Sequence, residues 1–284
     1  MIEVEMLINE NTRKRGDIML RSLACSAQEN GVACKITKKY SSKLKNLMLW
    51  GVGDHDRNLI FLDHIKNGGD AFCWDMGYWH SRSGSDVRNA YNRFSKNHFH
   101  PQALLLDLEL KEGYKDRFDL HDSLVFRDVY DENGPIILVG NGPKTCAHLG
   151  MSRGSWEAKA LARIVEKFGK KKKIIFRPKP NNDYESLDGV TVDQLSSIDD
   201  LMCGASLVVC RHSNVAVDAI RNGIAVSCED GAANAVYNDD LSNKPISLDI
   251  AKDFLAKLAW FNYSPVQGAT GVFWKFAIEH GVIP

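Results

Sequence analysis

The 284-residue sequence has no pattern that marks a metal site, a membrane span or a strongly charged surface. Its seven cysteines form no CxxC pair, which is typical of small buried thiols in a reducing compartment. No apolar run approaches the ~20 residues of a membrane helix, and residues 2–8 alternate acidic and apolar side chains, unlike a secretory signal. Lys+Arg and Asp+Glu balance at 36 each, so no overall field recruits nucleic acid. We therefore expect a cytoplasmic protein without a membrane partner.

What the sequence does contain is ordinary globular material with a mildly uneven charge. At 44% hydrophobic and 25% charged residues, the chain is long enough for two domains. Residues 1–100 carry 15 Lys+Arg against 11 Asp+Glu, and five of the nine histidines. This surplus hints at an anionic partner, although solvated surface charge is the simpler explanation. Adjacent aspartates at 199–200 and 239–240 lie in helix-start or turn contexts, so we expect no metal ion.

Strand, loop and helix signals alternate along both halves, which predicts an α/β fold with parallel sheets. A turn cluster at residues 131–135 separates the halves, so we expect domains at 1–133 and 134–258, followed by a helical segment at 259–284. The expected strands are residues 2–8, 33–37, 46–52, 71–74, 136–139, 173–176, 206–210 and 224–228. The expected helices are residues 15–30, 54–66, 155–170, 197–204 and 213–223, with a helical tail at 248–280. The helix at 54–66 offers Leu59, Ile60, Leu62 and Ile65 for its buried face.

Three of the expected strands end in loops suited to phosphate. Glycine lets the backbone approach a ligand closely, prolines fix the chain, and Arg or Lys supply positive charge. Because the carboxyl ends of parallel strands share one edge, we expect these loops to converge. An exposed basic turn remains the alternative for the second loop. The candidate contacts are Gly142 and Lys144 in the first loop, Arg177 and Lys179 in the second, and His212, Ser213 and Asn214 in the third.

Two acids follow the third loop. Asp218 lies one helical turn beyond Asn214, where its carboxylate could hold sugar hydroxyls, or could simply be a surface acid. Glu229 follows the strand at 224–228, and either contacts a ribose or sugar, or belongs to a turn. Ser213 is expected to cap the helix that carries Asp218 and to leave other amides for an anion.

The block from 136 to 231, and above all CRHSNVAVDAIRNGIAVSCED, resembles the donor-binding domain of GT-B glycosyltransferases. The resemblance implies two Rossmann-like domains facing a central cleft, with the C-terminal segment crossing back to the first. It implies that Arg177 and Lys179 hold the diphosphate of a nucleotide-sugar, with UDP-sugar favoured, while Ser213 and Asn214 add helix-terminal contacts. Asp218 stands where many members carry a glutamate. The nucleotide-sugar would be a co-substrate, and no cofactor is expected.

The segments CWDMGYW, YNRFSKNHFHP and LAWFNYSPVQGATGVFW resemble phage-encoded glycosyltransferases, some of which modify hydroxymethylated pyrimidines in DNA. The resemblance implies double-stranded DNA as an acceptor, and the host cytoplasm as location. A glycan-directed transferase is the alternative, and so is a non-catalytic nucleotide- or DNA-binding protein on the same scaffold.

The first domain must supply the acceptor side. Asp75 ends the strand at 71–74, where a carboxylate could act as general base if transfer inverts configuration. Asp54 and His55 are the second choice. Trp79 is expected to be exposed and, with His98 and His100, to contact the acceptor, although a core role for the aromatic residues is an equal alternative.

Overall fold

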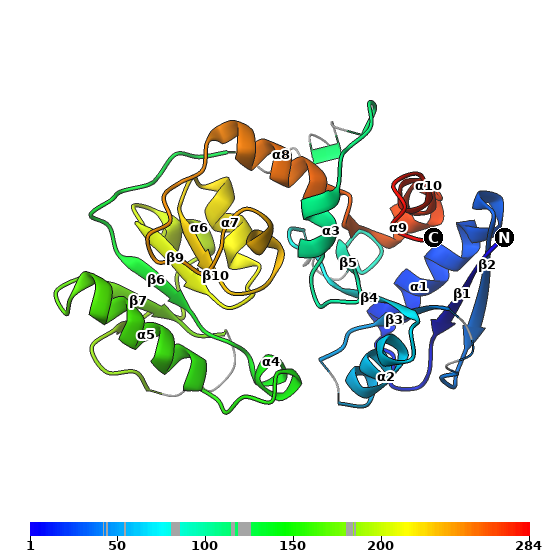
Figure 1. Ribbon diagram of the computed structural model, residues 1–284, viewed down its shortest axis with the longest axis horizontal. Helices are drawn as coiled ribbons and strands as arrows, with labels where there is room; N and C mark the ends of the chain where they lie inside the picture. Colours follow the sequence, from blue (N-terminus) through cyan, green and yellow to red (C-terminus); the bar gives the residue numbers. More distant parts are fainter. Residues whose placement is uncertain are drawn as a thin grey trace. The chain divides into compact units, whose positions relative to one another are not determined.

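The computed structural model describes residues 1–41, 43, 45–53, 55–80, 86–114, 117–118, 126–179, 184 and 186–284. The chain divides into two compact units, of which unit 1 comprises Met1–Phe118 and Ala256–Pro284, and unit 2 comprises Asp119–Leu255. Each unit contains one β-sheet with helices around it (Figure 1). The α/β class agrees with the sequence, while the predicted boundaries at 133 and 258, and the predicted arrangement around a cleft, stay predictions.

The sheet of unit 1 has the strand order β11-β5-β4-β3-β1-β2. Its members are β1 (Ile2–Leu7), β2 (Val32–Thr37), β3 (Asn46–Trp50), β4 (Asp70–Met76), β5 (Asn92–Lys96) and β11 (Asn262–Tyr263). The first four run parallel, whereas β5 and β11 extend the sheet with antiparallel pairs beyond β4. Every residue of β3 is buried, as expected for a parallel strand covered on both faces. The sequence predicted β1 to β4 but missed β5.

The helices of unit 1 are α1 (Lys14–Ala27), α2 (His55–Lys66), α3 (Gln102–Asp107), α9 (Pro265–Ala269) and α10 (Val272–Glu279). A 3-10 turn at Gln28–Asn30 ends α1 at Gly31, whose φ of 75° is the left-handed value predicted for a terminating glycine. The predicted buried face of α2 is right for Ile60 and Ile65, which pack against the core, and wrong for Leu59 and Leu62, which are 52% and 49% exposed. Phe61 and His64 are buried instead, and His64 Nε2 donates to the Lys45 carbonyl at 3.1 Å.

The C-terminal segment completes the core of unit 1. In place of one helical tail it forms β11, α9 and α10, because Asn262–Tyr263 pairs with β5. The Phe273 ring contacts the rings of Trp74 and Phe94, with centroids 5.0 and 4.9 Å apart. Trp274 Nε1 also donates to the Leu23 carbonyl at 2.8 Å. Residues far apart in the sequence therefore build one aromatic core.

The sheet of unit 2 is entirely parallel, with the order β10-β9-β6-β7-β8. Its strands are β6 (Ile136–Val139), β7 (Ile174–Arg177), β8 (Thr191–Val192), β9 (Leu207–Cys210) and β10 (Val226–Cys228). Its helices are α4 (Pro143–His148), α5 (Ser155–Phe168), α6 (Ile198–Met202), α7 (Val215–Arg221) and α8 (Leu248–Ala259), with a 3-10 turn at Ala232–Ala235. The helix α8 carries the chain from unit 2 into unit 1.

The amphipathic helix α5 packs as its sequence predicts. Trp156, Ala160 and Ile164 are buried in the cluster that also contains residues of β6 and β7. The apolar stripe ends before Phe168, which is 38% exposed. The lysine run at 170–173 follows the C-terminus of this helix, where cations complement the helix dipole.

No helix in the described ranges combines the length and the apolar character needed to span a membrane.

Candidate functional site

The three predicted phosphate loops lie at one edge of the unit 2 sheet. Strands β9, β6 and β7 are adjacent and parallel, so the loops that follow them are neighbours, as the sequence predicts. From β6 the chain proceeds to β7 and β8 on one side, then to β9 and β10 on the other. A doubly wound sheet binds ligands where this order reverses, which is between the carboxyl ends of β6 and β9.

The loop after β6 is held close to β7 by a glycine and a buried acid. A Cβ on Gly140 would lie 3.1 Å from the Phe176 ring and 3.3 Å from Pro178 Cα, so this position favours glycine. Asn141 donates its backbone N and its Nδ2 to Glu157 Oε1, at 2.6 and 3.1 Å. Glu157, on α5, is only 4% exposed. Its carboxylate therefore fixes the backbone and the side chain of Asn141 within this loop.

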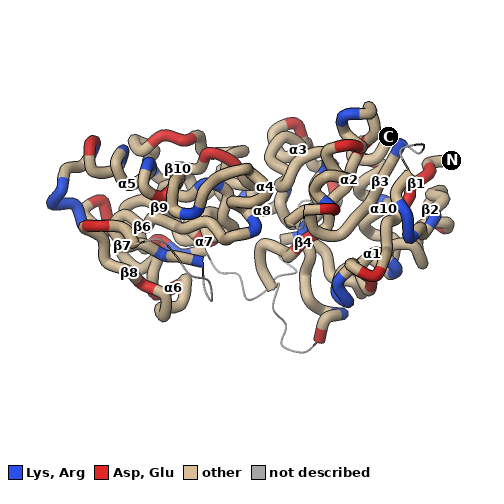
Figure 2. Tube along the Cα trace, turned by 90° about the horizontal axis from the view of Figure 1, so that it is seen from below, with Lys and Arg blue, Asp and Glu red and all other residues tan. Residues whose placement is uncertain are grey.

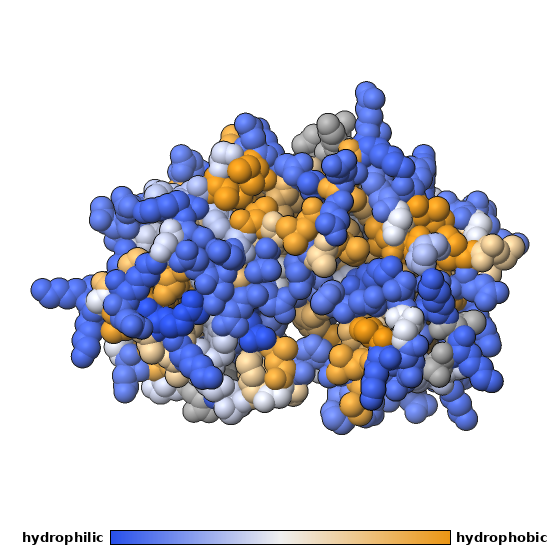
Figure 3. Space-filling view, in the orientation of Figure 1, coloured by the Kyte–Doolittle hydropathy of each residue, from blue (hydrophilic) through white to orange (hydrophobic). Residues whose placement is uncertain are grey.

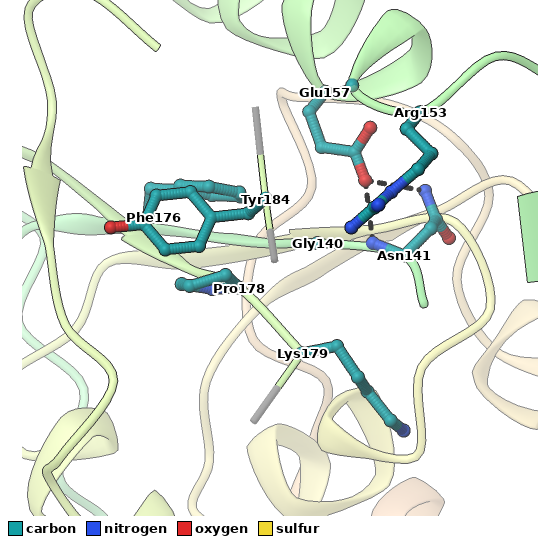
Figure 4. A pocket seen from close by; sticks show the side chains of 9 residues that line it. Gly140, Asn141, Arg153, Glu157, Phe176, Pro178, Lys179 and Tyr184 are labelled. Carbon is teal, nitrogen blue, oxygen red and sulfur yellow. Dashed lines mark hydrogen bonds between the residues drawn. The ribbon is translucent and has the colours of Figure 1, made fainter. Parts of the chain in front are cut away.

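A pocket opens beside this loop (Figure 4). Its empty volume is about 330 Å³, including space open to solvent. Glu157 and Asn141 lie on one side, and the rings of Phe176 and Tyr184 on the other. The two rings meet edge to face with centroids 5.8 Å apart. The pocket residues are Gly140, Asn141, Arg153, Gly154, Glu157, Phe176, Pro178, Lys179 and Tyr184.

The two cations of the loop after β7 differ in their surroundings. Arg177 is 8% exposed, and its Nη1 donates to the Asp193 backbone oxygen at 3.0 Å and to Asp193 Oδ1 at 3.4 Å. Lys179 is exposed and lines the pocket. In this structure Lys179 is thus better placed for a phosphate, and the diphosphate role of Arg177 stays a prediction. In the first loop Lys144 is also exposed, while Gly142 directly precedes α4.

The loop after β9 contacts the loop after β6. Thr145 Oγ1 and His212 Nε2 lie 3.2 Å apart, which joins α4 to the turn before α7. Ser213 Oγ accepts from Val215 N at 3.3 Å, but the N-cap residue of α7 is Asn214, which makes no side-chain capping bond. The next two amides, of residues 216 and 217, donate to the backbone oxygens of Ser213 and Asn214. These amides are not left for an anion, so the predicted contribution of this turn rests on its side chains.

Glu229 belongs to a network at the same edge. Trp156 Nε1 donates to its Oε1 at 2.5 Å, and Arg211 Nη1 donates to its Oε2 at 3.0 Å. Gly231 brings the loop after β10 against the loop after β9, since a Cβ there would lie 2.9 Å from His212 Cα. The carboxylate of Glu229 is thus held between α5 and β9, and 29% of its side chain remains exposed.

Asp218 lies among charges from neighbouring elements. Arg221 Nη2 is 3.7 Å from Asp218 Oδ1 and 3.1 Å from Asp199 Oδ1. Burial raises the pKa of Asp218 to about 7, which Arg221 opposes and Asp199 reinforces. Its predicted role toward sugar hydroxyls stays a prediction.

In unit 1, Asp75 lies in the last part of β4 and directly opposite Arg93 of β5. Arg93 Nη2 lies 3.3 Å from Asp75 Oδ2, and the two side chains are 7% and 27% exposed. Arg15, on α1, donates its Nε to Asn92 Oδ1 at 2.6 Å. Burial lowers the pKa of Arg15, and the Asp75 charge raises it again. Asp75 is therefore a partly exposed acid that is paired with Arg93 and acts on Arg15 through its charge. Its role as general base stays a prediction.

The predicted acceptor residues are mostly interior. The expectation that Trp79 is exposed is wrong, because it is 7% exposed and packs edge-on against Phe118, with centroids 5.7 Å apart. His100 is 1% exposed, and its Nδ1 lies 3.1 Å from the Tyr78 hydroxyl. His98 is exposed. Their acceptor roles stay predictions. Of the second choices for a base, His55 begins α2, and Asp54 lies outside the described residues.

Two residues of the site, Glu157 and Arg211, were not among the predicted ones. Glu157 follows an apolar residue at the start of an amphipathic helix, where an acid ordinarily complements the helix dipole at the surface. Its burial depends on Asn141, which the fold brings close. Arg211, by contrast, lies inside a predicted loop, and the charge pattern could have paired it with Glu229. Within the described ranges, no three His, Cys, Asp or Glu side chains are grouped to hold a metal ion.

Comparison with known proteins gives matches in fold. No protein-family model matches the chain, and no curated protein matches its sequence. A similar solved structure is KpsC, beta Kdo 2,4 transferase, from Thermosulfurimonas dismutans, with a TM-score of 0.56 and 10% identity over 94% of each chain. A second is KpsC, beta Kdo 2,7 transferase, from the same organism, with a TM-score of 0.56 and 12% identity over 96% of this chain and 99% of that one. This chain therefore shares its fold with sugar transferases along nearly all of its length.

Proposed function

We propose that the chain is a glycosyltransferase that moves a sugar from a nucleotide donor to an acceptor hydroxyl. The supporting observation is that three strand-end loops are neighbours, and that the loops after β6 and β7 line a pocket with exposed cations, in a fold shared with transferases of Kdo, an acidic sugar. Lys144 and Lys179 would stabilise the departing phosphate groups electrostatically. His212 and Ser213 would add polar contacts from the loop after β9.

Asp75 in unit 1 would take the acceptor proton if transfer inverts configuration. Its partial exposure and its fixed contact with Arg93 suit a carboxylate that must keep one orientation. If transfer retains configuration, no such base is needed, and Asp75→Asn would then leave turnover intact.

We propose a carbohydrate hydroxyl as acceptor. The two transferases of similar fold are named for a sugar. Charged residues of both signs are interspersed along both units (Figure 2), and the face drawn in Figure 3 is mostly hydrophilic with separate apolar patches. Double-stranded DNA would instead favour a continuous basic surface. Hydroxymethylated pyrimidine in DNA is the second candidate, favoured by the basic surplus of residues 1–100.

The test begins with the purified chain and a panel of UDP, GDP, ADP and CMP in a thermal-shift assay. We expect at least one nucleotide to raise Tm by several degrees, because ligand binding stabilises the folded state. The corresponding nucleotide-sugar should then be hydrolysed slowly, and consumed faster with carbohydrate acceptors than with hydroxymethylated DNA. Binding without any turnover would identify a non-catalytic nucleotide-binding protein, and no binding at all would contradict the donor site.

A further inference from the structure

We infer that Glu157 contacts the base of the donor nucleotide in the pocket of Figure 4 and favours bases that carry an exocyclic amino group. The inference rests on the proposed function, because it assigns one part of the donor within unit 2. It goes beyond that function by naming the class of base and the residue that selects it.

The first argument is the incomplete hydrogen bonding of a buried acid. Glu157 is 4% exposed and lines the pocket, and its Oε1 already accepts two hydrogen bonds from Asn141. Its Oε2 is buried without a hydrogen-bond partner. A buried carboxylate oxygen without a donor is unfavourable, so this site is suited to a ligand N–H or O–H group. Arg153, an exposed cation, lies on the same pocket wall.

The second argument is the composition of the pocket walls. Opposite Glu157 lie the Phe176 and Tyr184 rings, and Tyr184 is 42% exposed, so its ring can stack on a flat ligand. The negative charge of Glu157 disfavours a phosphate or carboxylate group in direct contact with its Oε2. Lys179 lines another part of the pocket and suits the phosphate of the same ligand. A nucleoside with an attached phosphate has a group for each wall: a base edge for Glu157, a flat ring for Tyr184 and a phosphate for Lys179.

The third argument separates the bases. A carboxylate only accepts hydrogen bonds. Cytosine, adenine and guanine each present an amino group on the edge used for base pairing, whereas uracil presents one N–H between two carbonyl oxygens. Those oxygens would approach a negative charge and be repelled. An acid at this position therefore favours an amino-bearing base over uracil, the base expected from the sequence.

The test measures the affinities of CDP, ADP, GDP and UDP for the purified full chain by calorimetry, because the four share one diphosphate. We expect at least one amino-bearing nucleotide to bind at least about tenfold more tightly than UDP, as for a hydrogen bond to a charged group. Glu157→Gln replaces one carboxylate oxygen by an amide that donates, so it should remove this preference and improve UDP binding. Tyr184→Leu should weaken all four nucleotides alike, since stacking is tolerant of the base.

The matched control is Glu166→Gln, which makes the same chemical change at an exposed position of the same helix and should leave all four affinities unchanged. UDP as the tightest ligand of the unaltered chain would overturn the inference while the proposed function stands, and this result needs no variant to fold. An unchanged order of affinities in folded Glu157→Gln would overturn it as well. If none of the four nucleotides binds, the donor site of the proposed function fails together with the inference.

Discussion

Arg177→Ala and Lys179→Ala should separate folding from nucleotide binding, although the two cations are two residues apart. The Arg177 side chain is 9% exposed and its ion pair with Asp193 joins the ends of β7 and β8. Loss of one hydrogen bond between charged groups costs about 1.5–3 kcal/mol. For a unit of this size that corresponds to a Tm lower by about 5–10 °C. Nucleotide affinity should remain close to that of the unaltered chain.

Lys179→Ala should have the opposite profile. The side chain is exposed, so its truncation should change Tm by no more than about 1–2 °C. A lost charge-assisted phosphate contact should weaken the nucleotide by about tenfold. Differential scanning fluorimetry gives the first quantity, and calorimetry with the tightest-binding nucleotide gives the second.

Asp193→Ala is the matched control, because it breaks the ion pair from the acidic side and removes no cation. It should lower Tm as Arg177→Ala does and leave nucleotide affinity unchanged. The reasoning is refuted if Arg177→Ala keeps its Tm and loses the nucleotide. That outcome would mean that Arg177 leaves Asp193 for the phosphate, as the sequence predicts.

Three further variants test other parts of the chain. Asp75→Asn should abolish transfer and leave donor affinity unchanged. It should also lower Tm by a few degrees, because Arg93 loses its charged partner. Equal turnover in the variant and the unaltered chain would disprove Asp75 as the general base. Burial raises the pKa of Asp218 from 3.8 to about 7, so between these values the folded chain holds a proton that the unfolded chain has released. The free energy of unfolding should therefore decrease as the pH rises from about 4 to about 8. Urea unfolding across that range should show a smaller decrease in the free energy of unfolding for Asp218→Asn than for the unaltered chain. An equal dependence on pH in the two proteins would contradict the raised pKa of Asp218. At Gly231 the φ is 96°, and an added Cβ would lie 2.9 Å from His212 Cα, whereas at Gly189 the φ is 75° and no atom lies within 4 Å of the added Cβ. Gly231→Ala should therefore lower the free energy of unfolding by at least ~1 kcal/mol more than Gly189→Ala. Equal denaturant midpoints for the two variants would contradict the close approach at Gly231.

The unit 2 sheet could be predicted from sequence because its strands are short continuous apolar runs that end in Gly, Pro or polar loops. Strand β5 could not be predicted in the same way. Its residues Asn92, Arg93 and Ser95 are polar and buried, and each has a hydrogen-bond partner far away in the sequence. Arg15 bonds Asn92 across 77 positions, and Asp75 pairs with Arg93 across 18. A pattern within a few neighbouring residues cannot indicate partners that are so distant in the sequence.

The lack of information on distant partners also limits what the sequence can predict about the candidate site. The sequence predicted which loops meet, because parallel strands bring their carboxyl ends together. It could not predict which way each side chain points within a loop: the Arg177 guanidinium donates to Asp193, a contact that the sequence does not indicate, and its role toward a diphosphate stays a prediction. The irregular segment around Trp79 predicts an exposed ring, yet Phe118, 39 positions further along the sequence, packs against it. The orientation and the burial of a side chain depend on tertiary contacts, and both determine whether it can reach a ligand.

The return of the chain to unit 1 has a consequence for synthesis on the ribosome. Unit 2 is one continuous stretch, so all of it is made before the segment that completes unit 1. Until residues 256–284 emerge, the nascent unit 1 lacks the Phe261 carbonyl that accepts from Phe94 N at 2.9 Å, and the Gly268 carbonyl that accepts from Ser26 Oγ at 2.7 Å. Its β5 edge and its aromatic interior are open to wrong partners during that interval. The portion of the polypeptide that is translated first is thus the portion that finishes folding last.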